Sequence, residues 1–293
     1  MKVSGFTFIR NAVKFDYPII EAIQSILPLC DEVVVAVGNS EDETLDLIQS
    51  IDPVKIKIIE TIWDDSLREG GKVLAIETDK AFHAISKDSN WAFYIQGDEV
   101  IHEKYHKNIS EAMLKCLDDP SIDGLLFHYQ HFYGSYDFVG SSPNWYRNEI
   151  RIIRNDKTIF SYRDAQGFRK HPNEKLNVAA IEAEVFHYGW VKDPRAMQRK
   201  QETFNKFWHD DEWVEQNVIK SEEFKYEEHI SELKRFQGTH PEVMIKRINK
   251  KNWVFDFDIT RNKTSLKNHF KNFLYHYLYF DVSYKNYILK KKI

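Results

Sequence analysis

The chain has 293 residues, of which 42% are hydrophobic and 29% charged, and its formal net charge is −4. These values are typical of a folded protein with one large domain, or with a domain and a helical appendage. The two cysteines, Cys30 and Cys116, lie far apart without metal-binding spacing, which argues against a disulfide framework and a zinc site. No segment approaches the roughly 18–20 apolar residues of a membrane span, and the N-terminus lacks a signal-peptide pattern. We therefore expect a cytoplasmic protein.

Charge is distributed unevenly along the chain. Residues 245–293 contain twelve Lys and Arg against three Asp, so this tail carries +9 and the rest of the chain −13. A basic, aromatic tail on an acidic body indicates an anionic partner at one end, although a solvated helical face has the same composition. Nucleic acid is not expected as the partner of an acidic body without a basic groove.

The first hundred residues alternate between strand and helix patterns. Glu32–Val37 is a short, nearly continuous apolar run, which predicts a strand buried on both faces. Val3–Ile9 alternates apolar and small residues, Lys55–Ile62 is rich in β-branched residues, and apolar residues at helical spacing occur in the segments between the strands. This order predicts an α/β fold with a mostly parallel sheet, helices on both faces and ligands at the carboxyl ends of the strands. The predicted strands are Val3–Ile9, Glu32–Val37, Lys55–Ile62 and Trp91–Ile95, and the predicted helices begin at Pro18 and Thr44 and cover Val73–Ile85.

The rest of the chain is less regular, and its strands and helices do not alternate. Asp193-Pro194 is typical of a helix cap followed by the first helical residue. We interpret residues 1–190 as the catalytic domain and residues 191–293 as a C-terminal helical extension. The predicted elements are a helix over His106–Leu117, a strand over Gly124–Phe132, a hairpin of Glu149–Arg154 and Thr158–Tyr162 turning at Asn155-Asp156, a strand over Val178–His187, a helix from Arg195 and an amphipathic helix over Lys263–Phe280.

The most informative segment follows the fourth predicted strand, which ends in Gln96-Gly97-Asp98-Glu99. Gly97 leaves room for a ligand close to the backbone, and the two acids lie at the carboxyl edge of the sheet. Carboxylates in that position suit Mn²⁺ or Mg²⁺ bridging the phosphates of a nucleotide. The alternative is a strand that ends in ordinary solvated acids.

This pattern resembles the family-2 glycosyltransferases of the GT-A fold, in which the fourth strand ends in Asp-x-Asp. Asp98 matches the last acid, which usually touches the metal, and Glu99 follows it as a second expected metal ligand. Gln96 replaces the first acid, so it would contact the ribose as a neutral hydrogen-bonding group. The resemblance implies a Rossmann-like GT-A domain and inverting, divalent-metal-dependent sugar transfer from a nucleotide-sugar donor.

A second match lies after the second strand. Residues 37–44 resemble the Asp-Asp-Gly-Ser-Thr-Asp-Gly-Thr of the family, and they retain Ser40, Asp42 and Thr44, whereas Val37-Gly38 replaces the leading acids. The resemblance therefore implies that Asn39 and Asp42 lie at the nucleotide. Ser40 and Asp42 are equally suited to capping the helix that follows.

Further candidate site residues follow in part from the resemblance and in part from the local sequence. Arg10 is expected at a phosphate and Asn11 at the edge of the base, and the alternative for each is a turn residue without a ligand. Lys72, after the Gly70-Gly71 turn, is expected at the diphosphate together with backbone N–H groups. His187 is expected as the third metal ligand, with a hydrogen-bonded core histidine as the alternative. Lys192, Arg195 and Arg199 follow it and would neutralise the leaving diphosphate, or form a solvated helical face.

An inverting transfer needs a carboxylate that deprotonates the acceptor hydroxyl. Asp164 is the expected catalytic base, with Glu182 and Glu184 as further candidates, and an ion pair of Asp164 with Arg163 or Arg169 is the structural alternative. A dense aromatic segment lies between the fourth strand and the hairpin, and it would form either an acceptor platform or core. Its members are Tyr129, His131, Tyr133, Tyr136 and Trp145.

The expected function is therefore a glycosyltransferase of polysaccharide biosynthesis that moves a sugar to a saccharide or lipid-linked acceptor. One alternative is a non-catalytic nucleotide-sugar-binding module that kept the fold, which the Gln96 and Val37-Gly38 departures favour. A sugar nucleotidyltransferase usually needs a basic, glycine-rich loop that Val3–Asn11 lacks, and a dehydrogenase would need GxGxxG. The segment from Leu266 to Lys292 would bring the protein to the inner face of an anionic membrane or to a lipid-linked acceptor, or it would pack on the catalytic domain.

Overall fold

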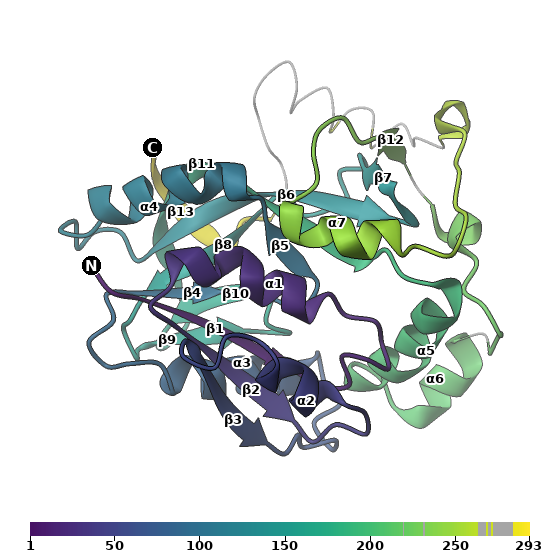
Figure 1. Ribbon diagram of the computed structural model, residues 1–293, viewed down its shortest axis with the longest axis horizontal. Coiled ribbons are helices and arrows are strands. Elements are labelled where there is room, and N and C mark those ends of the chain that lie inside the picture. Colours follow the sequence, from purple (N-terminus) through teal and green to yellow (C-terminus); the bar gives the residue numbers. More distant parts are fainter. Residues whose placement is uncertain (219, 231, 263–267, 269–270, 272–283) are drawn as a thin grey trace.

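The computed structural model describes residues 1–218, 220–230, 232–262, 268, 271 and 284–293 (Figure 1). The amphipathic helix predicted over Lys263–Phe280 lies outside these described residues. The strands are β1 Val3–Ile9, β2 Glu32–Gly38, β3 Ile56–Thr61, β4 Trp91–Tyr94, β5 Glu99–Ile101, β6 Gly124–Tyr133, β7 Ser135–Gly140, β8 Asn148–Arg154, β9 Ile159–Tyr162, β10 Gly167–Lys170, β11 Glu174–Trp190, β12 Leu233–Arg235 and β13 Tyr287–Lys292. The helices are α1 Ile19–Ile26, α2 Thr44–Gln49, α3 Lys72–His83, α4 His106–Lys115, α5 Pro194–Phe204, α6 Asp211–Asn217 and α7 Glu242–Asn249, and the short 3₁₀ turn η3 covers Asn205–Phe207.

The N-terminal part of the sheet is parallel, in the order β3-β2-β1-β4. The clearest sequence signal is that of β2, an almost unbroken run of β-branched residues that is buried along nearly its whole length. One apolar core joins the sheet to α1 and α4, and a second core joins its other face to α3. The predicted α/β class is thus confirmed, with helices on both faces of the sheet.

The prediction of a mostly parallel sheet is wrong, because only part of the sheet is parallel. Beyond β4 the order continues β8-β6-β11-β10-β9, and β8 runs antiparallel to both β4 and β6. Since neighbours occupy both edges of β8, the predicted hairpin between β8 and β9 does not form. Strand β9 pairs with β10 instead.

The longest strand, β11, joins distant parts of the chain. It pairs in parallel with β6 along one edge, and it also pairs with the late strand β13 in parallel and with β5 in antiparallel direction. Strand β12 also comes from the C-terminal region and pairs with β7. Among the described residues, no helix is long and apolar enough to cross a membrane.

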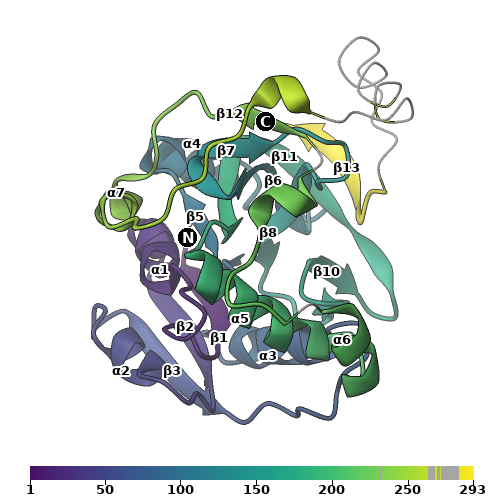
Figure 2. The same cartoon turned by 90° about the vertical axis from the view of Figure 1, so that its right-hand side faces the viewer.

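The carboxyl ends of the parallel strands lie next to helices from beyond residue 190. Helix α5 begins as predicted, because the Asp193 side chain accepts a hydrogen bond from the backbone N–H of Arg195. Figure 2 shows α5 and α6 in front of the sheet, close to α3, while α7 lies beside α1. Contacts between the loop before α3 and the segment after α5 hold this arrangement, since the N–H of Gly71 donates to the carbonyl of Phe207.

Candidate functional site

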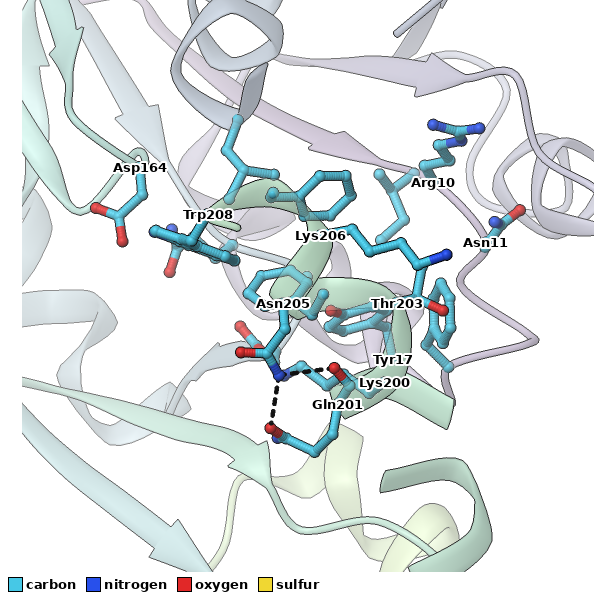
Figure 3. A pocket seen from close by; sticks show the side chains of 18 of the residues that line it. Arg10, Asn11, Tyr17, Asp164, Lys200, Gln201, Thr203, Asn205, Lys206 and Trp208 are labelled. Carbon is cyan, nitrogen blue, oxygen red and sulfur yellow. Dashed lines mark hydrogen bonds and ion pairs between the residues drawn. The ribbon is translucent and has the colours of Figure 1, made fainter. Parts of the chain in front are cut away.

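A cavity of about 860 Å³ lies at the carboxyl ends of β1 and β4. The loops after β1, β3 and β4 form one side, and residues of α5, η3 and α6 form another. In Figure 3, side chains from α5 and η3 lie between Asp164 on one side and Arg10 and Asn11 on the other. The predicted site residues that line the cavity are Arg10, Asn11, Gln96, Gly97, Asp98, Asp164 and His187.

Asp98 presents its carboxylate to the cavity, with 12% of its side chain exposed. The ammonium of Lys200 lies 3.4 Å from Oδ2, and Nε2 of His187 lies 3.7 Å from Oδ1. Burial alone would raise the pKa of Asp98, but His187, Lys200 and Lys192 outweigh burial and lower this pKa to about 2. Burial also lowers the pKa of His187, so at neutral pH Lys200 is, among the described residues, the cation nearest to an ionised Asp98.

Lys200 is a site residue that the sequence interpretation did not identify. Its ammonium also donates to the carbonyl of Gly189 at 3.1 Å, and its side chain is only 11% exposed. Helical spacing could have identified it, because Lys200 follows the buried Met197 by three residues and therefore lies on the same inner face of α5. Three other cations are predicted from the sequence to neutralise a leaving diphosphate. Of these, Lys192 is buried and donates to the carbonyl of Asp16, while Arg195 and Arg199 do not line the cavity.

The groups around Asp98 fit a divalent cation. A carboxylate oxygen and an imidazole nitrogen face each other: the carboxylate suits Mn²⁺ or Mg²⁺, and the imidazole suits a transition metal such as Mn²⁺ better than Mg²⁺. A Cβ atom at Gly189 would lie 2.7 Å from Oδ2 of Asp98 and 2.8 Å from Nε2 of His187, so glycine keeps the space between them open. The described residues contain no cluster of three ionisable ligands. A cation here would take its other ligands from phosphates and water, as Mg²⁺ commonly does.

The prediction of Glu99 as a metal ligand is wrong. Its side chain is fully buried and forms a two-point ion pair with Arg151, at 2.8 Å from Nε to Oε2 and 2.7 Å from Nη2 to Oε1. The hydroxyl of Tyr129 donates to the same carboxylate at 2.7 Å. The backbone N–H of Gln96 also donates to this carboxylate, so Glu99 stabilises the turn after β4 from the protein interior. Glu99 does not line the cavity.

The Gln96 side chain reaches toward the opposite wall of the cavity. Its amide nitrogen donates to the carbonyl of Ala165 at 3.1 Å and to the hydroxyl of Tyr94 at 3.3 Å. Gln96 therefore links the turn after β4 to the loop that carries Asp164. Gln96, which stands where the motif has its first acid, thus has a structural role, and it still lines the cavity.

The matched residues after β2 hold two loops together and do not line the cavity. The side chains of Ser40, Asp42 and Thr44 accept hydrogen bonds from backbone N–H groups of the loop after β1, at 2.7–3.0 Å. Asp42 also accepts from the N–H of Thr44 at the start of α2. The prediction of Asp42 at the nucleotide is therefore corrected, because both of its oxygens are used within the protein.

Asn39 and Lys72 also lie outside the cavity lining. The Asn39 side chain accepts from the N–H of Trp63, and its carbonyl accepts from Nε of Arg10. Lys72 is an exposed residue at the first turn of α3, and the preceding N–H of Gly71 is already bonded to Phe207. Both predictions are corrected: Asn39 positions Arg10 from behind, and Lys72 faces solvent.

Arg10 and Asn11 line the cavity as predicted, and both side chains also form hydrogen bonds with other residues of the protein. Nη1 of Arg10 lies 2.6 Å from Asp65, and its guanidinium lies 5.5 Å from the ring centre of Trp63. The side-chain oxygen of Asn11 accepts from the N–H of Glu41. Asn11 has a φ of +55°, which its loop tolerates because asparagine adopts this region more readily than most residues.

Asp164 lies in the cavity on a short loop between β9 and β10, packed against Gly71. Burial raises the pKa of its carboxyl group. Among the described residues it forms no ion pair, and Arg169 bonds to Asn286 instead. The other two base candidates do not line the cavity: Glu182 is exposed, and Glu184 accepts from the hydroxyl of Tyr105.

The aromatic segment is mainly core. His131, Tyr133 and Tyr136 are buried, and they pack among other aromatic rings. Within the described part of the chain, the aromatic side chains that line the cavity beyond β4 include Tyr146 and Trp190. Phe204, Phe207 and Trp208 line the cavity as well, whereas the five residues of the earlier run do not.

No protein-family model and no curated protein matches this chain. It is similar to a crystal structure of S. aureus TarS 1-349, at 14% identity over 76% of this chain and 67% of that one, with a TM-score of 0.41. It is also similar to Mycobacterium tuberculosis glucosyl-3-phosphoglycerate synthase in complex with Mn²⁺, UDP and phosphoglyceric acid, at 20% identity over 45% and 43% of the chains, with a TM-score of 0.28. A third is 4-diphosphocytidyl-2C-methyl-D-erythritol synthase from Anaerococcus prevotii, at 10% identity over 53% and 70%, with a TM-score of 0.32. All three TM-scores are below 0.5, so these likenesses carry no conclusion about the function of this chain.

Proposed function

We propose that this protein is a GT-A type glycosyltransferase, which transfers a sugar from a nucleotide-diphosphate donor with the help of a divalent cation. The observation that carries the proposal is the position of Asp98. Its carboxylate enters the cavity where β4 ends, beside an imidazole nitrogen of His187 and the ammonium of Lys200. Ligands of α/β folds bind at this edge of the sheet.

The size and lining of the cavity support a nucleotide-sugar donor. Its volume of about 860 Å³ falls within the range of about 300–1,000 Å³ that is usual for small-molecule sites. Asp98 and His187 would hold the cation, which when bound would stabilise the negative charge of the leaving diphosphate. Lys200, next to Asp98, would contact the same diphosphate. Arg10 would contact a phosphate of the donor from the loop after β1.

Asp164 is the proposed catalytic base of an inverting displacement. Its carboxylate lines the same cavity without an ion pair among the described residues, and burial raises its pKa, which makes it a stronger proton acceptor than a solvated aspartate. The hydroxyl of the acceptor would lose its proton to Asp164 while the oxygen attacks the sugar. Tyr146 and Trp190 would stack on a saccharide acceptor or on the sugar of a lipid-linked one.

The proposal is tested with a panel of UDP-, GDP-, dTDP- and CMP-sugars in the presence of Mn²⁺, by measuring release of the nucleotide. Asp98→Asn keeps the size of the side chain and removes its charge, so we expect turnover to fall about 10²–10³-fold, as when another transition-state contact is lost. Asp46→Asn, on the exposed face of α2, is the matched control and should retain turnover.

Two results would contradict the proposal. If the protein binds a nucleotide sugar but never consumes it, the chain is a binding module and the catalytic part is wrong. If Asp98→Asn turns over at the wild-type rate, Asp98 has no part in the transfer.

A further inference from the structure

Two histidines from neighbouring strands meet behind Asp98. His131 of β6 and His187 of β11 are directly paired across this parallel part of the sheet, so their side chains lie on the same face. Their Nδ1 atoms are 3.2 Å apart, which is a hydrogen-bond distance. One of the two rings must therefore donate through Nδ1, and the other must accept.

The surroundings of His131 decide which ring donates. Its Nε2 lies 2.7 Å from the carbonyl oxygen of Tyr146, and a carbonyl only accepts, so this nitrogen carries a hydrogen. The ring is 3% exposed and stacks between Tyr129 and Trp145, with ring centres 5.4 and 4.9 Å away. Among the described residues, no carboxylate is hydrogen-bonded to it. A ring buried in this way is neutral and has a single N–H, so its Nδ1 accepts.

The hydrogen on Nδ1 therefore belongs to His187. A neutral His187 that donates through Nδ1 has a lone pair on Nε2, and this atom faces Oδ1 of Asp98 at 3.7 Å. Two hydrogen-bond acceptors thus point into one space. Gly189 keeps that space open, because any Cβ at this position would come within 2.8 Å of both side chains. Two lone pairs around a small open space match the needs of a metal cation.

We propose that His131 is a positioning residue, which holds His187 in the tautomer whose Nε2 binds a divalent cation together with Asp98, while Gly189 preserves the space for that cation. Metal-binding histidines generally donate their second N–H to a partner that fixes the ring. Here the partner is a second imidazole, which is itself fixed by a backbone carbonyl. The inference rests on the proposed function only for the phosphates that complete the coordination.

The tautomer can be measured on the unchanged protein without metal or donor. We expect the imidazole ¹⁵N resonances of ¹⁵N-histidine-labelled protein to show His187 protonated on Nδ1 and not on Nε2, with the assignment made by loss of those signals in His187→Ala. Protonation of His187 on Nε2 would overturn the inference, whatever the variants below show.

Mn²⁺ affinity, measured by electron paramagnetic resonance without donor, tests the role of each residue. His131→Phe keeps an aromatic ring but cannot accept from His187, so we expect Mn²⁺ affinity to fall about 10–100-fold. His131→Gln restores an acceptor and should recover part of the loss. Gly189→Ala should weaken Mn²⁺ binding at least about tenfold by steric exclusion while leaving the His187 tautomer unchanged, and Gly238→Ala, at an exposed glycine, should bind as the wild type does.

These outcomes separate the inference from the proposed function. If Mn²⁺ binds with the expected pattern but no nucleotide sugar is consumed, the inference stands and the enzymatic proposal fails. If transfer proceeds and His131→Phe binds Mn²⁺ as tightly as the wild type, the transferase stands and the role of His131 is wrong.

Discussion

The turn after β4 separates two regions that the chain reaches with consecutive residues. On one side, Asp98 faces a cavity with His187 and Lys200 close to its carboxylate. On the other side, Glu99 is fully buried and bonded at two points to Arg151. The difference shows that two adjacent acids at the end of a strand do not form one site. Asp98 lies in the turn and Glu99 is the first residue of β5, and the backbone here directs one carboxylate into the cavity and the other into the protein interior.

The largest effect is expected on the buried side. Glu99→Gln keeps the shape of the side chain but leaves the Arg151 guanidinium without a counter-charge in the interior. We expect the free energy of unfolding to fall by about 3–5 kcal/mol, as when one partner of a buried ion pair is removed. Urea denaturation followed by circular dichroism measures this change.

Glu111→Gln is the matched control for this change, because its ion pair with Lys107 on α4 is exposed. We expect it to change the free energy of unfolding by less than about 1 kcal/mol. If Glu99→Gln is as stable as this control, the contrast between the two sides of the turn is wrong.

The cavity side should respond in donor binding and not in stability. Lys200→Met keeps much of the apolar stem and removes the ammonium beside Asp98. We expect the KM for the nucleotide-sugar donor to rise about 10–100-fold, since a hydrogen bond to a charged group contributes about 1.5–3 kcal/mol. Steady-state kinetics measure this, with the exposed Lys87→Met as control. An unchanged KM would show that Lys200 only neutralises Asp98.

A pH-dependent effect is expected from Glu149, which lies on the buried side near Arg151. Burial raises the pKa of Glu149 to about 8, and the charges of Glu99 and Asp164 add to this. Between about pH 4.5, where the unfolded carboxyl titrates, and about pH 8, the folded protein retains a proton that the unfolded chain has lost. The stability that this provides is complete below the unfolded pKa and disappears as pH rises to about 8.

We therefore expect the free energy of unfolding to fall across this window by at most about 1.4 kcal/mol per pH unit from this group. Glu149→Gln resembles the protonated form and should flatten the curve. The check is urea denaturation at several pH values, and a slope that is the same in both proteins would contradict the assignment.

The N-terminal half of the fold could be predicted because its signals are local. The apolar runs of β2 and β4 and the alternation of apolar and small residues in β1 specify buried strands, and the segments between them have helical periodicity. The pairing of β8 with β4 and β6, and of β9 with β10, could not be predicted in this way. Those pairs depend on which edges of the sheet remain free once the distant strands are in place.

The same distinction applies to the candidate site. Asp98 and Arg10 were identified because both follow parallel strands whose carboxyl ends meet at one edge. Lys200 was missed because its place depends on how α5 docks, and Glu99 was misassigned because Arg151, its partner, lies 52 residues further along the chain. Resemblance pointed to Asp42 as a nucleotide ligand, whereas the fold uses this residue to join two loops.

The late strand β13 has a practical consequence for anyone who shortens this protein. It runs beside residues 176–180 of β11, whose other edge is already paired with β6. A fragment of residues 1–190 would leave that stretch with a row of unpaired backbone N–H and C=O groups. Such a row recruits strands from other molecules, so the fragment should self-associate, and a soluble minimal unit has to carry residues 287–292 with it.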